Sequence, residues 1–249
     1  MAKAKQAIEW LAAFHAAFYN HPILRSTEDD EHSIWSSGGY WHLPTRMNEL
    51  ENMSTHGSKI MLKMSALAID ERMNRVNLDG NSSFTLVHGD YKEANILFGS
   101  SNCAVVDFQY CGKGYGAKDL VMYVVSSMST RVFEEMGGED GVLGFYCGRL
   151  RDNLDHTKKH SSTGTAGGAN ANLDVLKMQY ELALVDYVRF MAGWGMWGSQ
   201  CNYAEGRALE ILDEVATEWV CAGQDKSKFD FTSADWMEAI NGKYPEEMF

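Results

Sequence analysis

One polar run near the middle of the chain constrains the fold more than any other feature of the sequence. The run HGDYKEAN (88–95) lies between two short apolar stretches, 84–87 and 96–98, and a third apolar stretch, 104–106, follows shortly after. Stretches of three or four β-type residues between polar turns are too short for helices and are typical of strands. The sequence therefore predicts a small β-hairpin cluster that carries two polar loops.

The rest of the chain is predicted to be mostly helical, which gives an α+β fold. Apolar residues recur at steps of three and four, the helical spacing, in the ranges 4–19, 49–77, 118–128, 132–154, 173–191, 203–222 and 233–240. Gly137, Gly138 and Gly141 interrupt the start of the fourth range. We expect a connecting loop at 27–40, a turn at 77–83 and a flexible surface loop at about 156–172, where Gly, Ser, Thr and Asn dominate.

Composition excludes several kinds of partner. The formal net charge of -12 argues against a nucleic-acid binder and against a polybasic membrane anchor. No apolar run approaches the roughly 20 residues of a membrane-spanning helix, and the N-terminus does not resemble a signal peptide. The 5 cysteines are scattered and show no metal-binding spacing. We therefore expect a cytoplasmic protein with reduced thiols that binds neither nucleic acid nor membrane.

Three oxygen-bearing side chains on the polar loops suit phosphoryl transfer. Asp90 suits the acceptor of a hydroxyl proton, while Asn95 and Asp107 suit Mg²⁺, a cation that prefers oxygen ligands. His88 is expected to hold the loop in shape by hydrogen bonds rather than to transfer protons. The alternative is that these residues only form turns, in which Asp and Asn are common.

These motifs resemble those of a known superfamily. HGDYKEANILF (88–98) followed by VVDFQ (105–109) is similar to the aminoglycoside phosphotransferase and choline kinase superfamily, which has the protein-kinase fold, and most similar to its CHK or ecdysteroid-kinase-like branch. The stretches 10–18, 38–46, 114–127 and 186–198 also fit that branch. Gly89 and Gln109 stand where protein kinases have Arg and Gly, and both differences suit the branch.

The resemblance implies roles for individual residues in an ATP- and Mg²⁺-dependent kinase that phosphorylates a hydroxyl of a small organic molecule. It implies that Asp90 is the catalytic base, that Asn95 and Asp107 bind Mg²⁺, and that Asp119 is a buried acid that supports the catalytic loop. Lys92 is implied to approach the transferred phosphate. The simpler alternatives are an exposed loop lysine for Lys92 and an ordinary helix N-terminal acid for Asp119.

Other residues are candidates for the substrate pocket. Trp35, Trp41, Trp194 and Trp197 either line a pocket, where they would cage a quaternary ammonium group, or belong to the core. Arg46 and Arg189 are either clamps for an anionic or hydroxylated substrate or members of salt bridges. The glycine runs 112–116 and 164–172 lack the strand–turn–helix context of a nucleotide loop, and we assign neither to ATP.

The resemblance also implies two lobes, of which the chain supplies one. The small lobe of such kinases carries a Gly-rich loop and a phosphate-binding lysine, whereas the lysines before His88 are Lys3, Lys5, Lys59 and Lys63, at the terminus or in helical patterns. We therefore expect residues 1–249 to form a single large lobe with the N-terminal lobe absent.

A missing lobe leaves the activity open. The chain is then either a truncated, weakly active kinase or a catalytically inactive, pseudokinase-like binding module, and the exposed face could allow self-association. A metal-dependent hydrolase fits less well, because no His ligand motif accompanies the acids.

Overall fold

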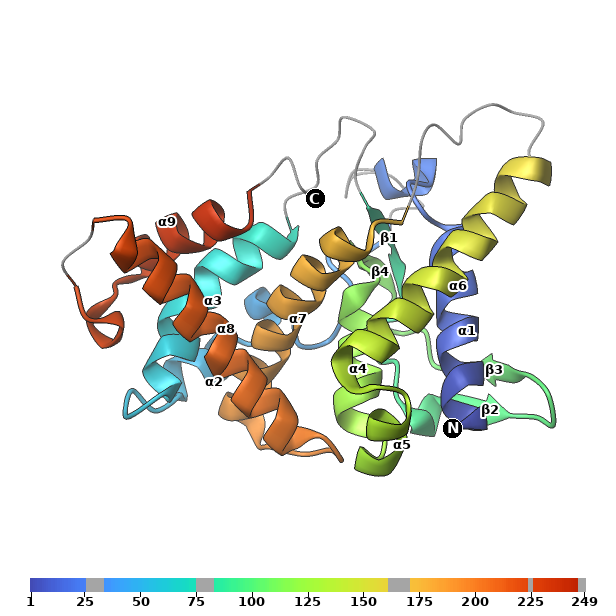
Figure 1. Ribbon diagram of the computed structural model, residues 1–249, viewed down its shortest axis with the longest axis horizontal. Coiled ribbons are helices and arrows are strands. Elements are labelled where there is room, and N and C mark those ends of the chain that lie inside the picture. Colours follow the sequence, from blue (N-terminus) through green and yellow to red (C-terminus); the bar gives the residue numbers. More distant parts are fainter. Residues whose placement is uncertain (26–33, 75–82, 161–170, 224–225, 246–249) are drawn as a thin grey trace.

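The computed structural model describes residues 1–25, 34–74, 83–160, 171–223 and 226–245 (Figure 1). The α-helices are α1 (Ala2–Ala17), α2 (Met47–Asn52), α3 (Lys59–Asn74), α4 (Ala117–Ser127), α5 (Thr130–Glu135), α6 (Gly138–His160), α7 (Leu173–Trp194), α8 (Cys201–Cys221) and α9 (Ser233–Lys243). The strands are β1 (Phe84–Val87), β2 (Ile96–Phe98), β3 (Cys103–Val105) and β4 (Gly112–Tyr115). Short 3-10 helices are η1 (Pro22–Arg25), η2 (Leu43–Thr45), η3 (Glu93–Asn95) and η4 (Lys228–Asp230).

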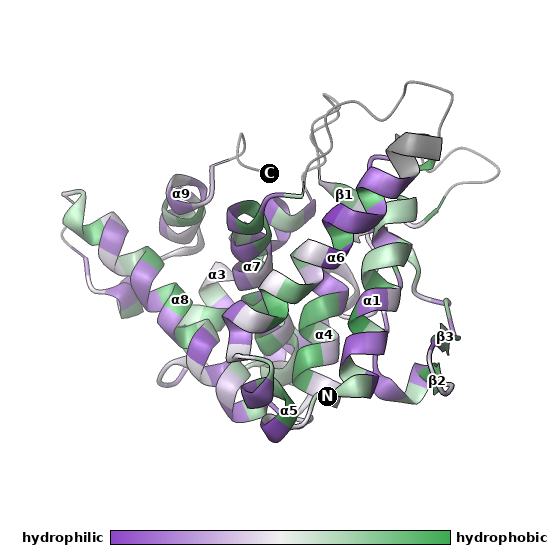
Figure 2. Ribbon diagram, turned by 45° about the vertical axis from the view of Figure 1, so that its right-hand side comes forward, coloured by the Kyte–Doolittle hydropathy of each residue, from purple (hydrophilic) through white to green (hydrophobic). Residues whose placement is uncertain are grey.

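Helix α7 lies at the centre of the helical part. It packs against α3 and α8 on one side and against α4 on the other, while α1 packs on α6 and α3 on α9 (Figure 1). Helix α4 is the most enclosed of these segments, since each residue from Ala117 to Val125 is buried and its ribbon is largely hydrophobic (Figure 2). Burial of apolar surface at this position is the main force that fixes the loops around α4.

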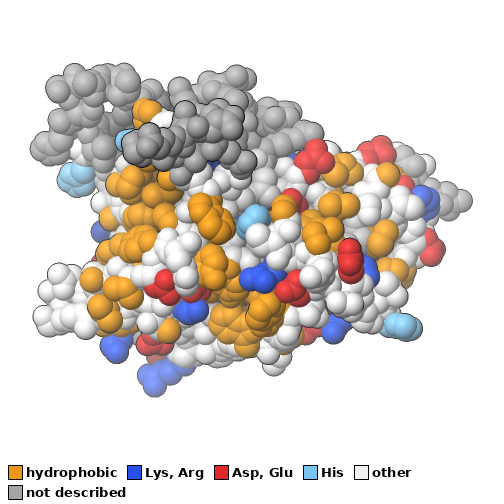
Figure 3. Space-filling model, turned by 180° about the vertical axis from the view of Figure 1, so that it is seen from behind, with side chains coloured by type: hydrophobic (Ala, Val, Ile, Leu, Met, Phe, Trp, Pro, Cys, Tyr) orange, Lys and Arg blue, Asp and Glu red, His pale blue; other side chains and the backbone are white. Residues whose placement is uncertain are grey.

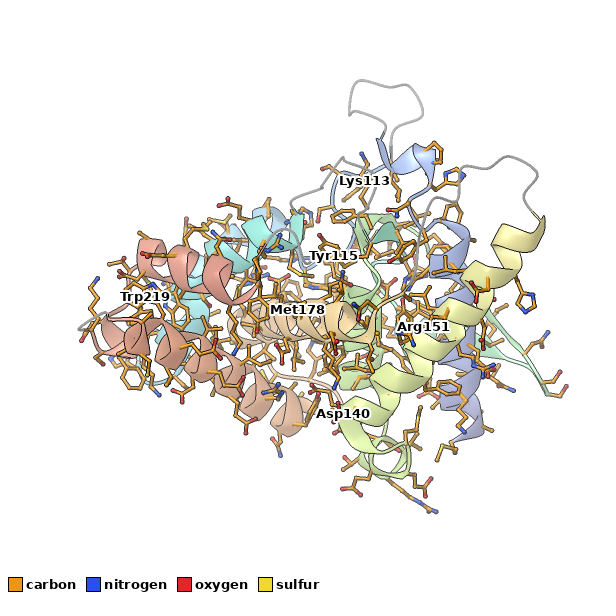
Figure 4. All side chains as sticks on the ribbon, turned by 45° about the horizontal axis from the view of Figure 1, so that its top comes forward. Lys113, Tyr115, Asp140, Arg151, Met178 and Trp219 are labelled. Carbon is orange, nitrogen blue, oxygen red and sulfur yellow. The ribbon has the colours of Figure 1, made fainter. Side chains whose placement is uncertain are left out.

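The four strands form two separate antiparallel pairs. Strand β1 pairs with β4, and β2 pairs with β3. Tyr115 of β4, labelled in Figure 4, is buried and packs edge-on against the Phe84 ring at 4.4 Å between centroids. The pairs are small, so their stability depends on the helices that cover them.

The predicted mostly helical α+β fold is confirmed, with local differences. The range 49–77 contains two helices, α2 and α3, and 132–154 contains α5 and α6, which are separated near Gly137. Helix α6 continues to His160, so the start of the predicted loop 156–172 is helical, and 161–170 lies outside the described residues. Residues 77–82 of the predicted turn and 27–33 of the predicted loop 27–40 also lie outside them, whereas 34–40 form neither a helix nor a strand, apart from the bridge of Trp35 to Gly112. Strand β3 is shifted by one residue, and β4 was not predicted.

The segment that leads into α2 is attached to the edge of β4. The amide of Gly38 donates to the Lys113 carbonyl oxygen at 2.8 Å, and the Lys113 amide donates to Trp35 at 3.0 Å. Two buried cations bind the same segment: Lys118 Nζ donates to the Gly38 carbonyl at 2.9 Å, and Arg189 Nη2 donates to the Trp41 carbonyl at 2.8 Å. Burial lowers the pKa of Lys118.

The molecular surface carries hydrophobic side chains beside charged ones on the face opposite to that of Figure 1 (Figure 3). Large apolar side chains that are exposed among the described residues include Trp35, Phe108 and Trp194. Self-association stays a prediction.

In the described part of the chain, no helix combines the length and apolar character that crossing a membrane requires.

Candidate active site

The strand pairing brings the two polar loops side by side. Val87 at the end of β1 pairs with Gly112 at the start of β4, and Ile96 at the start of β2 pairs with Val105 at the end of β3. The segments 88–95 and 106–111 therefore both run from one strand pair to the other. The Val106 amide donates to the Asn95 carbonyl oxygen at 3.0 Å, which joins the two segments.

His88 connects the same two loops through the hydrogen bonds of its ring. Its Nε2 is 3.0 Å from the Val106 carbonyl oxygen, and its Nδ1 accepts a hydrogen bond from the Asp90 amide at 3.2 Å. These partners assign the proton to Nε2, because a carbonyl oxygen only accepts. Both ring nitrogens are thereby engaged in loop contacts. The geometry agrees with the predicted shape-holding role of His88.

Asp119 lies beneath the turn of the first loop. One carboxylate oxygen accepts from the His88 amide at 2.6 Å, and the other accepts from the Gly89 amide at 2.9 Å. His15 Nε2 lies 3.1 Å from the same carboxylate, and Tyr146 contacts the other ring nitrogen of His15 at 2.6 Å. Asp119 is fully buried. It thus contacts the backbone of the loop and not the pocket, as the predicted structural acid would.

The Asp90 carboxylate is held by two neighbours. Its Oδ2 lies 2.9 Å from Lys92 Nζ and 3.1 Å from Asn95 Nδ2. Asn95 Nδ2 also donates to the Asp90 backbone carbonyl at 2.9 Å. The other oxygen, Oδ1, is buried and has no hydrogen-bond partner within the described ranges. Since a buried carboxylate oxygen without a partner is costly, this atom is a candidate acceptor for a ligand hydroxyl.

Asp90 and Asp107 share one pocket of about 380 Å³. Its lining residues are Tyr40, Arg46, Asp90, Lys92, Asp107, Gln109, Tyr110, Trp194 and Trp197. Asp107 has a positive φ of 69°, which is uncommon for a residue with a side chain, although Asp adopts it more readily than most. Gln109 Nε2 donates to Asp107 at 3.4 Å. The acids that the sequence singled out therefore face one space, with Lys92 beside them.

The other predicted residues lie around this pocket or away from it. Three of them do not line the pocket but contact Asp90 or the backbone of its loop: Asn95, His88 and Asp119. Trp194 and Trp197 line it, whereas Trp41 is buried and Trp35 is 54% exposed and bridges to Gly112. Arg46 lines it, but Arg189 is buried and pairs with Asp186 at 2.7 Å. Arg189 is thus part of a salt bridge, not a clamp.

Sequence reasoning missed two lining residues, Tyr40 and Tyr110. Their rings contact each other at 5.4 Å between centroids, where the segment before α2 meets the second loop. The only signals were their positions: Tyr40 lies in the stretch 38–46, and Tyr110 directly follows VVDFQ.

One oxygen ligand that lines the pocket, from Asp107, and one behind it, from Asn95, are of the type that a magnesium ion takes. Asp107 offers a carboxylate, and Asn95 keeps its amide oxygen as an acceptor because its nitrogen donates to Asp90. Among the described residues, no three His, Cys, Asp or Glu side chains are grouped closely enough to hold a metal alone. Mg²⁺ does not require such a group, since it usually takes one or two carboxylates and completes its shell with water and phosphate.

Comparison with known proteins identifies the family. The model of a family described as ecdysteroid kinase-like matches residues 1–159, which makes the chain a kinase-like protein. More particularly, the chain belongs to the ecdysteroid kinase-like family, and the predicted kinase-like superfamily and branch are confirmed.

A solved structure is also similar. The choline kinase from Cryptosporidium parvum Iowa II aligns with a TM-score of 0.46 and 13% identity, over 88% of this chain and 66% of that chain. The chain thus spans slightly less than two thirds of that choline kinase. No curated protein matches the chain.

Proposed function

We propose that the chain carries the acceptor side of an ATP- and Mg²⁺-dependent phosphotransferase that acts on a hydroxyl of a small organic molecule. The observation that supports this most is the shared pocket, in which Asp90, Lys92 and Asp107 meet although they come from two separate loops. Phosphoryl transfer depends on positioned groups of this kind more than on covalent chemistry by the protein.

The proposed roles follow from the contacts. Asp90 orients the acceptor hydroxyl and takes its proton, while Asn95 fixes the orientation of the Asp90 carboxylate. Lys92 partly neutralises Asp90, and its proposed second role is to contact the transferred group. Asp107 and Asn95 would hold Mg²⁺. When bound, the ion offsets the charge of the phosphate oxygens of ATP.

A binding module without catalysis is the second candidate, and one observation favours it. The four lysines before His88 do not line the pocket. Lys3 and Lys5 belong to α1 and lie near the rings of Phe98 and Phe145. Lys59 and Lys63 belong to α3, and Lys63 donates to backbone carbonyls of α2 and its end. No lysine in this part of the described chain is placed to anchor ATP phosphates, so we expect slow turnover.

Transfer of phosphate from ATP to a panel of small alcohols, followed by phosphorus NMR, tests the proposal. We expect slow, Mg²⁺-dependent product formation that falls at least about 100-fold in Asp90→Asn, the loss typical of a missing general base. Asp107→Asn should weaken the Mg²⁺ dependence. Asp174→Asn is the control, because Asp174 is exposed on the first turn of α7 and far in sequence from the loops.

The possible outcomes separate the candidates. Binding of an alcohol without any transfer would favour the module, and equal rates in wild type and Asp90→Asn would refute the assigned base. Release of phosphate from an ester without nucleotide would indicate the hydrolase instead.

A further inference from the structure

Arg46 occupies a cage of three aromatic rings at the rim of the pocket. Its guanidinium carbon lies 4.9 Å from the Trp194 ring centroid, 5.7 Å from that of Tyr40 and 5.8 Å from that of Phe190. These distances are within the range of cation–π attraction. The aromatic surface that a cationic ligand would need is therefore already taken by a side chain of the protein.

The backbone holds this arrangement in place. Arg46 lies between η2 and α2, and its Nε donates to the Tyr40 carbonyl oxygen at 2.8 Å. Gly193 of α7 allows α2 to approach, because a Cβ at this position would lie 2.9 Å from the Glu49 carbonyl oxygen. The close contact of the two helices brings Arg46 over Trp194, the next residue of α7.

The guanidinium keeps donors for a ligand. Of its five N–H groups, Nε is used by Tyr40, and Nη1 lies 3.5 Å from Glu49 Oε1 in a pair where both side chains are 21% exposed. Nη2 has no acceptor in the part of the chain that the structure describes. The edge formed by Nη1 and Nη2 is the one with which arginine binds carboxylate or phosphate in a bidentate manner.

Tyr40 lines the pocket together with Arg46 and Asp90. Burial raises the pKa of the Tyr40 hydroxyl, Asp90 raises it further, and Arg46 lowers it. The tyrosine thus remains neutral and within electrostatic reach of both groups. A substrate whose hydroxyl lies at Asp90 and whose other end reaches Arg46 would share the pocket with the Tyr40 ring.

We infer that the acceptor is an alcohol that carries an oxyanion group, a carboxylate or a phosphate, which Arg46 binds in the pocket that it shares with Asp90. The position of the substrate hydroxyl at Asp90 rests on the proposed function, whereas the position of the oxyanion group rests on Arg46 alone. A quaternary ammonium substrate is disfavoured, because it would have to displace Arg46 from the rings and would meet a like charge.

Binding of three matched probes tests the inference without any need for catalysis. The probes are para-hydroxymethylbenzoate, para-hydroxymethylbenzamide and para-hydroxymethylbenzyl-trimethylammonium, which share one alcohol and differ in charge. Binding to the full chain is measured by ligand-observed NMR and by tryptophan fluorescence, to which Trp194 and Trp197 contribute at the pocket. We expect the carboxylate to bind at least about tenfold more tightly than the other two, the effect of one charge-assisted contact.

Three variants identify the group responsible. Arg46→Gln should abolish the preference for the carboxylate. Glu49→Gln, on the surface of α2, removes the competing carboxylate and should tighten binding of the anion about two- to threefold, the value of a weak exposed ion pair. Arg131→Gln is the control and should leave the preference intact, because Arg131 is exposed on α5, pairs with Glu135 and does not line the pocket.

Other results would overturn the inference. These are tighter binding of the ammonium probe, a preference that survives Arg46→Gln or vanishes in Arg131→Gln, or no binding of any probe. Because the assay measures binding only, a chain that prefers the anion but transfers no phosphate would uphold the oxyanion site and count against the proposed kinase activity.

Discussion

Replacing Gly89 with alanine is expected to destabilise the protein by about 4 kcal/mol or more, a loss seen only for severe substitutions. A Cβ at position 89 would lie 2.1 Å from the Tyr110 carbonyl oxygen and 2.7 Å from the Gly39 amide nitrogen. These two groups are hydrogen-bonded to each other at 3.1 Å. Neither can move without breaking this bond, which joins the segment before α2 to the loop 106–111. Gly89 also has a positive φ of 83°.

Gly57→Ala is the matched control for the backbone part of this effect. Gly57 has a φ of 61°, but a Cβ there would meet nothing within 4 Å. It should therefore show only the cost of an alanine at positive φ, about 1–2 kcal/mol. Thermal and urea unfolding of both variants give the comparison, with a fall in Tm of roughly 8–16 °C expected for Gly89→Ala. Equal losses in the two variants would show that the close contacts at Gly89 carry no energy.

The strands that bear the loops were predictable in part. Phe84–Val87 and Ile96–Phe98 consist of residues that favour strands, and the structure has β1 and β2 there. Strand β4, Gly112–Tyr115, has the sequence GKGY, in which only the final tyrosine favours a strand. It forms because it pairs with β1 and because the segment around Trp35 and Gly38 pairs with its other edge. Such pairing depends on residues far away in the sequence.

The candidate site was likewise predictable only in part. Sequence reasoning singled out Asp90 and Asp107, and the antiparallel pairing of β2 with β3 between them returns the chain to the same pocket. The aromatic residues that line the pocket could not be identified from the sequence, because an aromatic residue in a sequence indicates core and pocket equally well. Trp41 proved to be core and Trp194 pocket. The position of Arg46 over three rings depends on the packing of α2 against α7, which no local pattern encodes.

Asp119→Ala is expected to cost about 3–5 kcal/mol, the loss that follows when buried polar groups are left without their charged partner. The carboxylate accepts from two backbone amides, those of His88 and Gly89, and contacts His15, and all of these groups are buried. Alanine leaves every one of them without its acceptor. We therefore expect lower stability in urea unfolding, and faster hydrogen exchange of the His88 and Gly89 amides than of amides elsewhere in the core.

Asp174→Ala separates this role from that of an ordinary acid at a helix start. Asp119 and Asp174 both lie in the first turn of a helix, α4 and α7 respectively, but Asp174 is exposed. If Asp119 acted only on the helix dipole, both substitutions would cost about 0.3–1 kcal/mol. A cost for Asp119→Ala within that range, with unchanged exchange at His88 and Gly89, would mean that the loop holds Asp90 in place without Asp119. A several-fold larger cost would mean that the orientation of Asp90 toward the pocket depends on an acid that never touches the substrate.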